Sequence, residues 1–560
     1  MPVSRRAACL GATCLSAVLL LTTLPVQAFP LVGPKETFVP SPEAMRAHMT
    51  FLADDLMEGR EAGTRGYDLA ANYVAAQFAQ LGLKPAGDAG TYLQTVPLVA
   101  YRVAADGELK VAEAGAAPTA LAFGEDFLPS PQADKAELAL NAPLVFVGFG
   151  ISAPERGRDD FAGLDLAGKI VVVLAGAPKG FQTEERAHYG SLNIKRVEAA
   201  RRGAVGVLIL SVPSGEKRRP FARGIGGNRD WRMTWRAPDG SPFIRGASAP
   251  SLGSISVKGG RKLFGGAADR LEAAYAAAET TEGKVAGFAL PTTASIALKS
   301  QIEQRRSSNV AALIEGSDPT LKSEVVVLSA HLDHEGIREN PKPGEDAIYN
   351  GALDNASGIA TLLEVGRGFT SGKARPRRSI LLLAVTAEEK GLIGSEYFAH
   401  NPTVPKASLA ADVNLDMPVL LYPFVDVVAF GADRSTIGPI VAKAAARVDV
   451  ALSPDPMPEE GLFTRSDHYR FVEQGVPSVF LMTGFKNGGE KAFRDFLATH
   501  YHKPSDDLSQ PIDYQAAAKF ARVNYEIAHD LADAPQRPTW KAGDFFGSMF
   551  APQGHPSAAR

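Results

Sequence analysis

The sequence predicts an α/β protein with a mixed, mostly parallel sheet and helices on both faces of that sheet. From residue 324 onward, short runs rich in Val, Ile and Leu alternate with stretches of helical periodicity, a pattern typical of βαβ units. Several apolar runs end abruptly in His, Asp or Glu, and in open α/β sheets ligands bind beyond the carboxyl ends of the strands. The expected strands are 324–330, 379–386, 411–415, 426–430 and 475–482, and the expected helices are 355–368, 391–400, 435–447 and 514–531.

The bulk composition is that of an ordinary globular protein. At 560 residues the chain is long enough for two or more domains, with 45% hydrophobic and 22% charged residues. The net charge of −3 gives no electrostatic reason to expect nucleic acid or an anionic membrane as a partner.

The first 28 residues have the features of a signal peptide. Arg5 and Arg6 are followed by the apolar run Ala7–Leu24, and Val26-Gln27-Ala28 fits the small-residue cleavage rule. We therefore expect an exported protein, periplasmic or secreted, with no membrane attachment after cleavage. An uncleaved membrane anchor is the alternative, although the apolar run is only marginally long enough to span a bilayer.

Both cysteines, Cys9 and Cys14, lie within this segment. The mature chain would then have no thiolate, so His and carboxylate side chains would have to hold any metal.

The remaining chain is expected to form a catalytic domain interrupted by an insert. Residues 29–122 and 289–535 are assigned to the catalytic domain, 123–288 to the mainly β insert, and 536–560 to a loosely held, irregular tail. Arg, Gly and Pro are frequent in 216–248, which indicates a surface loop.

Two local patterns near the domain boundaries also lead to expectations. Helices are predicted over 41–56 and 67–81, and the glycine-bearing turn Glu58–Thr64 between them is interpreted as a plain connector. Ser295–Leu298 and Asn309–Ile314 have strand composition, and the polar residues between them suggest a hairpin.

Metal-binding residue types follow the first predicted strand of the main domain. His331 comes directly after it, and Asp333 is suitably spaced to accept the other imidazole N–H and set the tautomer. A single histidine at such a position is more often structural, so this pair alone leaves both interpretations open.

Further carboxylates and a histidine stand at the ends of other predicted elements. Asp354 precedes a helix, where it suits an N-cap but has two oxygens that can also bridge two cations. Glu388 and Glu389 are adjacent, so one can bind metal while the other remains a free base. Asp416 ends a short strand, and His502 lies in a loop with His500 as a second candidate.

The sequence motifs around these residues resemble those of the co-catalytic zinc exopeptidases. The motifs are Ser329-Ala-His-Leu-Asp-His, Gly351-Ala-Leu-Asp-Asn-Ala-Ser-Gly, Thr386-Ala-Glu-Glu-Lys-Gly, Asn414-Leu-Asp-Met and Tyr501-His-Lys-Pro-Ser-Asp. The family includes secreted bacterial aminopeptidases and glutamate carboxypeptidases. Separately, 145–209 is similar to the protease-associated domain, which is a common insert in this family; an unrelated α/β insertion is the alternative.

The resemblance implies a zinc exopeptidase fold with two Zn²⁺ ions per chain. It implies that His331 and Asp416 hold one ion, that Glu389 and His502 hold the other, and that Asp354 bridges them. Glu388 would be the general base and Asp333 the partner that orients His331. Tyr501 is implied as an oxyanion donor, with simple packing as the alternative, and Arg465 is expected to line the substrate cleft.

The expected substrates are peptides with a free N-terminus, because a carboxylate-rich rim suits an α-amino group. A carboxypeptidase or dipeptidase of the same family is the first alternative, with arginines of the insert as the anchor for a substrate carboxylate. A glutaminyl cyclase and a non-catalytic, receptor-like protein are further alternatives, and the complete ligand set counts against both. The sequence leaves the oligomeric state and the side-chain preference open.

Overall fold

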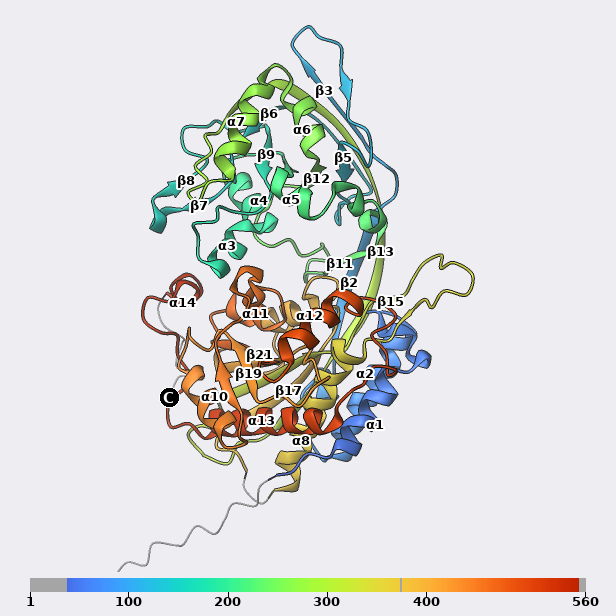
Figure 1. Ribbon diagram of the computed structural model, residues 1–560, viewed down its shortest axis with the longest axis vertical. Coiled ribbons are helices and arrows are strands. Elements are labelled where there is room, and N and C mark those ends of the chain that lie inside the picture. The colour runs from blue at the N-terminus through green and yellow to red at the C-terminus, as the bar shows by residue number, and fades with distance from the viewer. Residues whose placement is uncertain (1–37, 373–374, 553–560) are drawn as a thin grey trace, which may run out of the picture. The chain divides into compact units, whose positions relative to one another are not determined.

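The computed structural model describes residues 38–372 and 375–552 (Figure 1). The predicted signal peptide, residues 1–28, lies outside this part of the chain. Within the described residues, no helix has the length and apolar character needed to cross a membrane.

One sheet, called here the core sheet, supports the predicted catalytic region. Its strands lie in the order β11–β2–β13–β17–β14–β18–β21–β19–β20, and the neighbouring strands β17, β14, β18 and β21 run parallel. The bounds are β1 Lys84–Pro85, β2 Leu93–Val103, β11 Arg232–Trp235, β13 Phe288–Ile314, β14 Val325–His331, β17 Ser379–Val385, β18 Leu409–Leu415, β19 Asp426–Phe430, β20 Ala451–Ser453 and β21 Ser478–Thr483.

Helices cover both faces of the core sheet, as predicted. Successive residues of β14 point to opposite faces. Val326 and Leu328 belong to a buried cluster that also contains residues of α1, α2, α8, α10 and α13, whereas Val325 and Val327 belong to a cluster with residues of α9 and α11. The bounds are α1 Pro42–Leu52, α2 Arg65–Gln80, α8 Ser357–Ser371, α9 Ile393–His400, α10 Ile437–Ala446, α11 His468–Val472, α12 Gly489–Thr499 and α13 Tyr514–Asp533.

Strand β13 corrects the predicted hairpin. It runs without interruption from Phe288 to Ile314, and its middle part, 300–310, pairs antiparallel with β2. Residues 299–308 are mostly polar, but they contain neither Gly nor Pro, so no turn residue interrupts them and they continue the strand.

The first half of β13 belongs to a second group of strands, called here the insert sheet, in the order β4–β3–β13–β6–β9–β10–β12–β5. Because β3 and β4 pair there, residues 108–120 lie with the insert, not with the catalytic part to which the sequence assigned them. The bounds are β3 Glu108–Glu113, β4 Thr119–Ala120, β5 Phe127–Pro129, β6 Glu137–Phe146, β7 Ser152–Ala153, β8 Arg158–Asp159, β9 Ile170–Leu174, α3 Thr183–Gly190, α4 Leu192–Arg201, β10 Gly206–Leu210, α5 Pro213–Arg218, β12 Ser251–Ile255, α6 Val257–Phe264 and α7 Ala268–Ala278.

Two segments predicted as loops are ordered against the core. In 216–248, β11 pairs with β2, and Trp235 is buried and stacks on Phe243 with ring centroids 4.0 Å apart. In the tail, α14 (Phe545–Phe550) buries Phe546 completely. The expectation of a loosely held tail was wrong, and the expected surface loop 216–248, although mostly exposed, contains the strand β11. Aromatic anchors, not periodicity, hold these segments.

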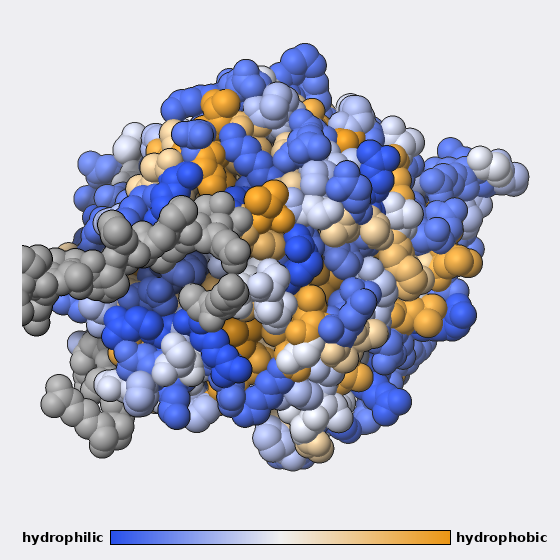
Figure 2. Space-filling view, turned by 90° about the horizontal axis from the view of Figure 1, so that it is seen from below, coloured by the Kyte–Doolittle hydropathy of each residue, from blue (hydrophilic) through white to orange (hydrophobic). Residues whose placement is uncertain are grey.

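The surface is mixed in character. On the face shown in Figure 2, hydrophobic patches alternate with hydrophilic residues. Large apolar side chains with high exposure, such as Val39, Leu56 and Ile337, lie in different parts of the sequence. Scattered exposed residues of this kind are normal for folded proteins.

Candidate metal centre

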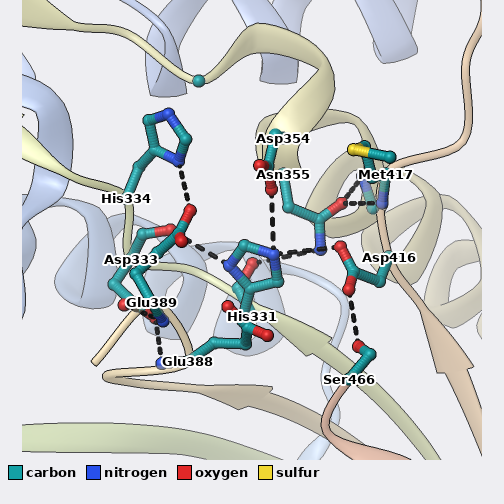
Figure 3. Close-up of polar contacts among 12 residues, drawn as sticks. His331, Asp333, His334, Asp354, Asn355, Glu388, Glu389, Asp416, Met417 and Ser466 are labelled. Carbon is teal, nitrogen blue, oxygen red and sulfur yellow. Dashed lines mark hydrogen bonds and ion pairs between the residues drawn. The ribbon is translucent and has the colours of Figure 1, made fainter. Parts of the chain in front are cut away.

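Most of the predicted site residues come together at the carboxyl edge of the parallel strands, and Figure 3 shows those that precede residue 417. His331 is the last residue of β14, and Asp416 follows β18. Glu388 and Glu389 follow β17, and Asp354 lies in the short helical turn η7 (Ala352–Ala356) just before α8. The topology thus delivers side chains from distant parts of the sequence to one edge of the sheet.

The first half of the site is centred on His331. Its Nε2 lies 3.0 Å from Oδ1 of Asp416 and 3.2 Å from Oδ1 of Asp354. The other oxygen of Asp416 accepts a hydrogen bond of 2.5 Å from Oγ of Ser466, which in turn accepts one of 2.6 Å from Asn414. Because His331 is almost fully buried, these contacts fix the geometry of the donors.

The second half is centred on His502, in the loop after α12. Its Nε2 lies 3.1 Å from Oε2 of Glu389 and 3.4 Å from Oδ2 of Asp354. His500, the other candidate in this loop, instead bonds through Nδ1 to the main-chain oxygen of Ser505 at 2.8 Å. The two oxygens of Asp354 therefore face the two halves of the site.

A third histidine, His334, also belongs to this cluster, and the sequence interpretation missed it. Its Nδ1 lies 2.7 Å from Oε1 of Glu389, and its buried Nε2 has no hydrogen-bond partner among the described residues. Its position three residues after His331 was the one feature of the sequence that could have identified it as part of the site.

Asp333 occupies a different position from the one expected. The Nδ1 of His331 contacts the main-chain oxygen of Asp333 at 3.1 Å, not its carboxylate. The carboxylate accepts hydrogen bonds from the backbone N–H groups of Glu388 at 3.0 Å and Glu389 at 3.3 Å. Asp333 follows His331 by only two residues on a turning backbone, so its carbonyl, not its carboxylate, faces the imidazole. The side chain of Asp333 is then free to bond the loop that contains Glu388 and Glu389.

The electrostatics of the cluster shift the pKa values of its two adjacent glutamates in opposite directions. Burial, opposed by the nearby imidazolium of His331, raises the pKa of Glu388 well above its ordinary value. Burial and Asp354 also act to raise the pKa of Glu389, but His334 and His502 outweigh them and lower it to about 2. Glu389 is thus held as an anion, whereas Glu388 is suited to carry a proton.

A cavity of about 300 Å³ opens beside the cluster. His331, Asp354, Glu388, Asp416, Tyr501, His502 and Arg465 all contribute to its wall. The ring of Tyr501 stacks on His502 with centroids 3.9 Å apart. Burial, followed by the neighbouring carboxylates, raises the pKa of Tyr501 far above its usual value, so its hydroxyl remains a donor. Arg465 is exposed at the rim, 3.6 Å from Glu460.

The donor set fits divalent cations. Ligand atoms of His331, Asp354 and Asp416 all lie within 4.8 Å of one another, and so do those of His334, Asp354 and Glu389. Imidazole nitrogens with carboxylate oxygens are a ligand set that zinc accepts. The fold and this cluster define the class of the molecule: an α/β protein with a site for divalent metal at the carboxyl edge of its sheet.

The family follows from sequence. The profile of Peptidase family M28 matches residues 309–528, so this part of the chain is similar to that family, and the resemblance to the zinc exopeptidases is confirmed. The chain is 28% identical over 265 residues to a probable zinc metalloprotease of Pyricularia oryzae, covering 41% of this chain and 50% of that protein. It is 27% identical over 269 residues to probable leucine aminopeptidase 2 of Aspergillus fumigatus, covering 44% and 49%. The chain thus spans about half the length of these curated relatives.

The fold extends beyond the matched region. The solved aminopeptidase from Aneurinibacillus sp. strain AM-1 superposes with a TM-score of 0.50 at 20% identity, covering 89% of this chain and 95% of that chain. At this identity the match bears on the fold alone, and it confirms the predicted mixed α/β fold.

Proposed function

We propose that this protein is a zinc-dependent aminopeptidase that binds two Zn²⁺ ions per chain. The observation that carries the proposal is the position of Asp354 between His331 and His502, with one carboxylate oxygen directed to each. A carboxylate shared in this way is the expected ligand of a dinuclear site such as those of aminopeptidases. The similarity of residues 309–528 to Peptidase family M28 and the names of the relatives support the same reaction class.

The residues that would hold the ions form two groups. His331 and Asp416 would bind one ion and Glu389 and His502 the other, with Asp354 common to both. His334 contacts Glu389 and would orient that carboxylate. Bound zinc would supply Lewis acidity toward a peptide carbonyl and a water molecule.

Glu388 would serve as the general base. It lines the cavity, stands next to Glu389 and makes no side-chain hydrogen bond to any described residue. A carboxylate in this position can take a proton from the attacking water and return it to the leaving amine. The hydroxyl of Tyr501, on the same cavity, would donate to the oxygen on which negative charge develops.

The cavity wall also supports a substrate class. Much of it is apolar and lies beside the cluster, which suits a peptide with a bulky apolar first residue; the apolar lining residues are Met417, Met457, Leu462, Phe480, Met482, Phe493 and Leu497. Glu460 also lines this cavity, and its carboxylate, 3.6 Å from Arg465, would have to exchange that partner to bind a free α-amino group.

A dipeptidase or carboxypeptidase activity is the second candidate, because Arg465 and Arg494 also line this cavity. Either guanidinium could pair with the terminal carboxylate of a short substrate.

One experiment separates these candidates. Purified protein, loaded with zinc, is offered leucyl-4-nitroanilide, an N-blocked analogue, and a dipeptide with and without a C-terminal amide. The aminopeptidase proposal requires cleavage of the free-amine substrates, abolished by a chelator and restored by zinc. Cleavage of N-blocked peptides only when their carboxylate is free would replace it with the second candidate.

We further infer export to the periplasm or medium, supported by the composition of residues 1–28, and a protease-associated identity for the insert, supported by its motif order. N-terminal sequencing of the protein from the producing cells tests the first: a mature start near Phe29 is expected, and an intact Met1 in the cytoplasm would refute it.

A further inference from the structure

Arg60 is a fully charged side chain buried directly beneath the candidate metal centre. It lies in the turn Glu58–Thr64 between α1 and α2, and only 1% of it is exposed. Its main chain adopts a positive φ of 50°, next to Gly59 at 66°. A Cβ on Gly59 would lie 2.3 Å from the carbonyl oxygen of Gly336, so the turn packs tightly against the loop that follows β14.

The guanidinium of Arg60 bonds to carbonyl oxygens of both ligand-bearing segments. Its Nε donates to Leu332 at 2.9 Å, and Leu332 directly follows His331. Its terminal nitrogens donate to Asn350 at 2.6 Å and to Gly351 at 3.1 Å, just before the turn that holds Asp354. A further bond to the carbonyl of Leu52 anchors the group to the end of α1.

Other contacts of the same turn bind the same two segments. The main-chain oxygen of Arg60 accepts a hydrogen bond of 3.2 Å from the N–H of His334. Asn350 donates its amide to the carbonyl of Ala53 at 3.0 Å and to Asp55 at 2.8 Å. The N-terminal helices and the two ligand segments are thus linked through one residue and its neighbours.

The positive charge of Arg60 is compensated by the carboxylates of the candidate metal centre, not by a bonded partner. All four of its acceptors among the described residues are neutral carbonyls, so no carboxylate bonded to it in this part of the chain accounts for its burial. Burial lowers the pKa of Arg60 to about 10, opposed by Asp333, Asp506, Asp354 and Glu389, and the group stays cationic at neutral pH. A buried cation is costly unless it is compensated, and here the cluster of carboxylates compensates it.

We propose that Arg60 is a positioning residue of the metal centre, which holds the His331 and Asp354 segments at the spacing that lets both contribute to one pair of ions. The inference rests on the proposed function, and it replaces the interpretation of Glu58–Thr64 as a plain connector. A planar group with several donors in fixed directions can bond two backbone segments at once, which a lysine cannot do equally well.

The test measures zinc binding by the full-length protein. Zinc affinity is determined by competition with a chromophoric chelator, and stoichiometry by elemental analysis, for the wild type, Arg60→Gln, Arg60→Lys and the control Arg65→Gln. Arg65 starts α2, and its side chain is 73% exposed. We expect Arg60→Gln to bind zinc about 10- to 100-fold more weakly, as for other residues that orient ligands. Arg60→Lys should recover part of this loss, and Arg65→Gln should match the wild type.

A folded Arg60→Gln protein with wild-type zinc affinity would overturn the proposal. If Arg60→Gln does not fold, the Arg60→Lys protein decides: weakened zinc binding supports the positioning role, and wild-type binding refutes it. A wild type that binds zinc but cleaves no aminoacyl substrate would refute the proposed function and leave the role of Arg60 testable by the same titrations. A wild type that binds no zinc would refute both.

Discussion

Asp354 faces His502 across the site, with Oδ2 3.4 Å from Nε2 of the imidazole, while its other oxygen lies 3.2 Å from Nε2 of His331. Burial would raise the pKa of Asp354, but the hydrogen bonds from His331 and His502 outweigh it and hold the pKa well below its ordinary value. The carboxylate is therefore an anion with both oxygens engaged, one on each half of the site.

The first prediction concerns this shared carboxylate. Asp354→Asn keeps the shape of the side chain but replaces one oxygen with an amide nitrogen, which cannot bind a cation. We expect zinc content to fall from two ions per chain to one or fewer, with loss of peptidase activity. Elemental analysis after gel filtration measures this, and Asp239→Asn, on the exposed surface, is the control. Two retained ions would contradict the bridging role.

Much of the site was accessible from the sequence because its residues directly follow apolar strands. Strand composition locates β14, β17 and β18, and parallel strands bring their carboxyl ends to one edge, so the sequence alone groups His331, Glu389 and Asp416. His502 reaches these residues through a long-range contact that leaves no local pattern in the sequence. Only the family motifs predicted that His502 belongs to the same site.

The remaining parts were missed for physical reasons. Arg60 bonds to backbone carbonyls, which carry no side-chain signal, so the turn that contains it has the composition of a connector. Most of residues 299–308 are polar, a composition that favours a turn, yet they lie in the middle of β13, which joins the two sheets. The tail is held by Phe546 and by Trp540, whose Nε1 bonds to the carbonyl of Gly475 at 2.8 Å. Isolated anchors of this kind leave no periodic pattern.

The second prediction separates the adjacent glutamates. Glu388→Gln removes the proposed proton acceptor and preserves side-chain size, so we expect zinc content to be unchanged and kcat to fall by about 10²- to 10⁴-fold. Glu389→Gln is the matched variant and should instead lose zinc, because its carboxylate contacts His502 and His334. If Glu388→Gln loses metal and Glu389→Gln retains it, the two roles are exchanged.

The third prediction concerns Tyr501. Tyr501→Phe keeps the ring that stacks on His502 and removes only the hydroxyl. If the hydroxyl donates to the developing oxyanion, kcat should fall by about 100-fold, with KM and zinc content close to wild type. Steady-state kinetics on an aminoacyl nitroanilide with parallel zinc analysis measures this. An unchanged kcat would mean that Tyr501 serves packing alone.

The fourth prediction concerns the ordered tail. Phe546 is fully buried and its ring contacts Phe463 and Tyr469, with centroids 5.4 and 5.7 Å apart. Phe546→Ala should lower the free energy of unfolding by about 3–5 kcal/mol, the usual cost of removing a buried aromatic ring. Denaturant unfolding measures this, and the exposed Met549→Ala is the control. Equal stability of the two variants would mean that the tail contributes little to the fold.

The last prediction concerns acid stability at the junction of insert, core and tail. His188, on α3, is buried, and its Nδ1 lies 3.1 Å from the hydroxyl of Tyr469. Burial lowers the pKa of His188 to about 4 in the folded protein, against the opposing effect of Glu473 and Glu155. In the unfolded chain its pKa is about 6.5.

Between these values the unfolded chain binds a proton that the folded protein does not, so His188 costs stability as the pH falls from about 6.5 to about 4. The difference in pKa corresponds to about 3 kcal/mol at the acidic end. His188→Gln keeps a polar partner for Tyr469 but does not titrate. Measured by urea unfolding of the zinc-free proteins at pH 7.5 and pH 4.5, the variant should lose less stability than the wild type over this interval. An equal loss in both proteins would show that His188 is protonated in the folded state or is accessible to water.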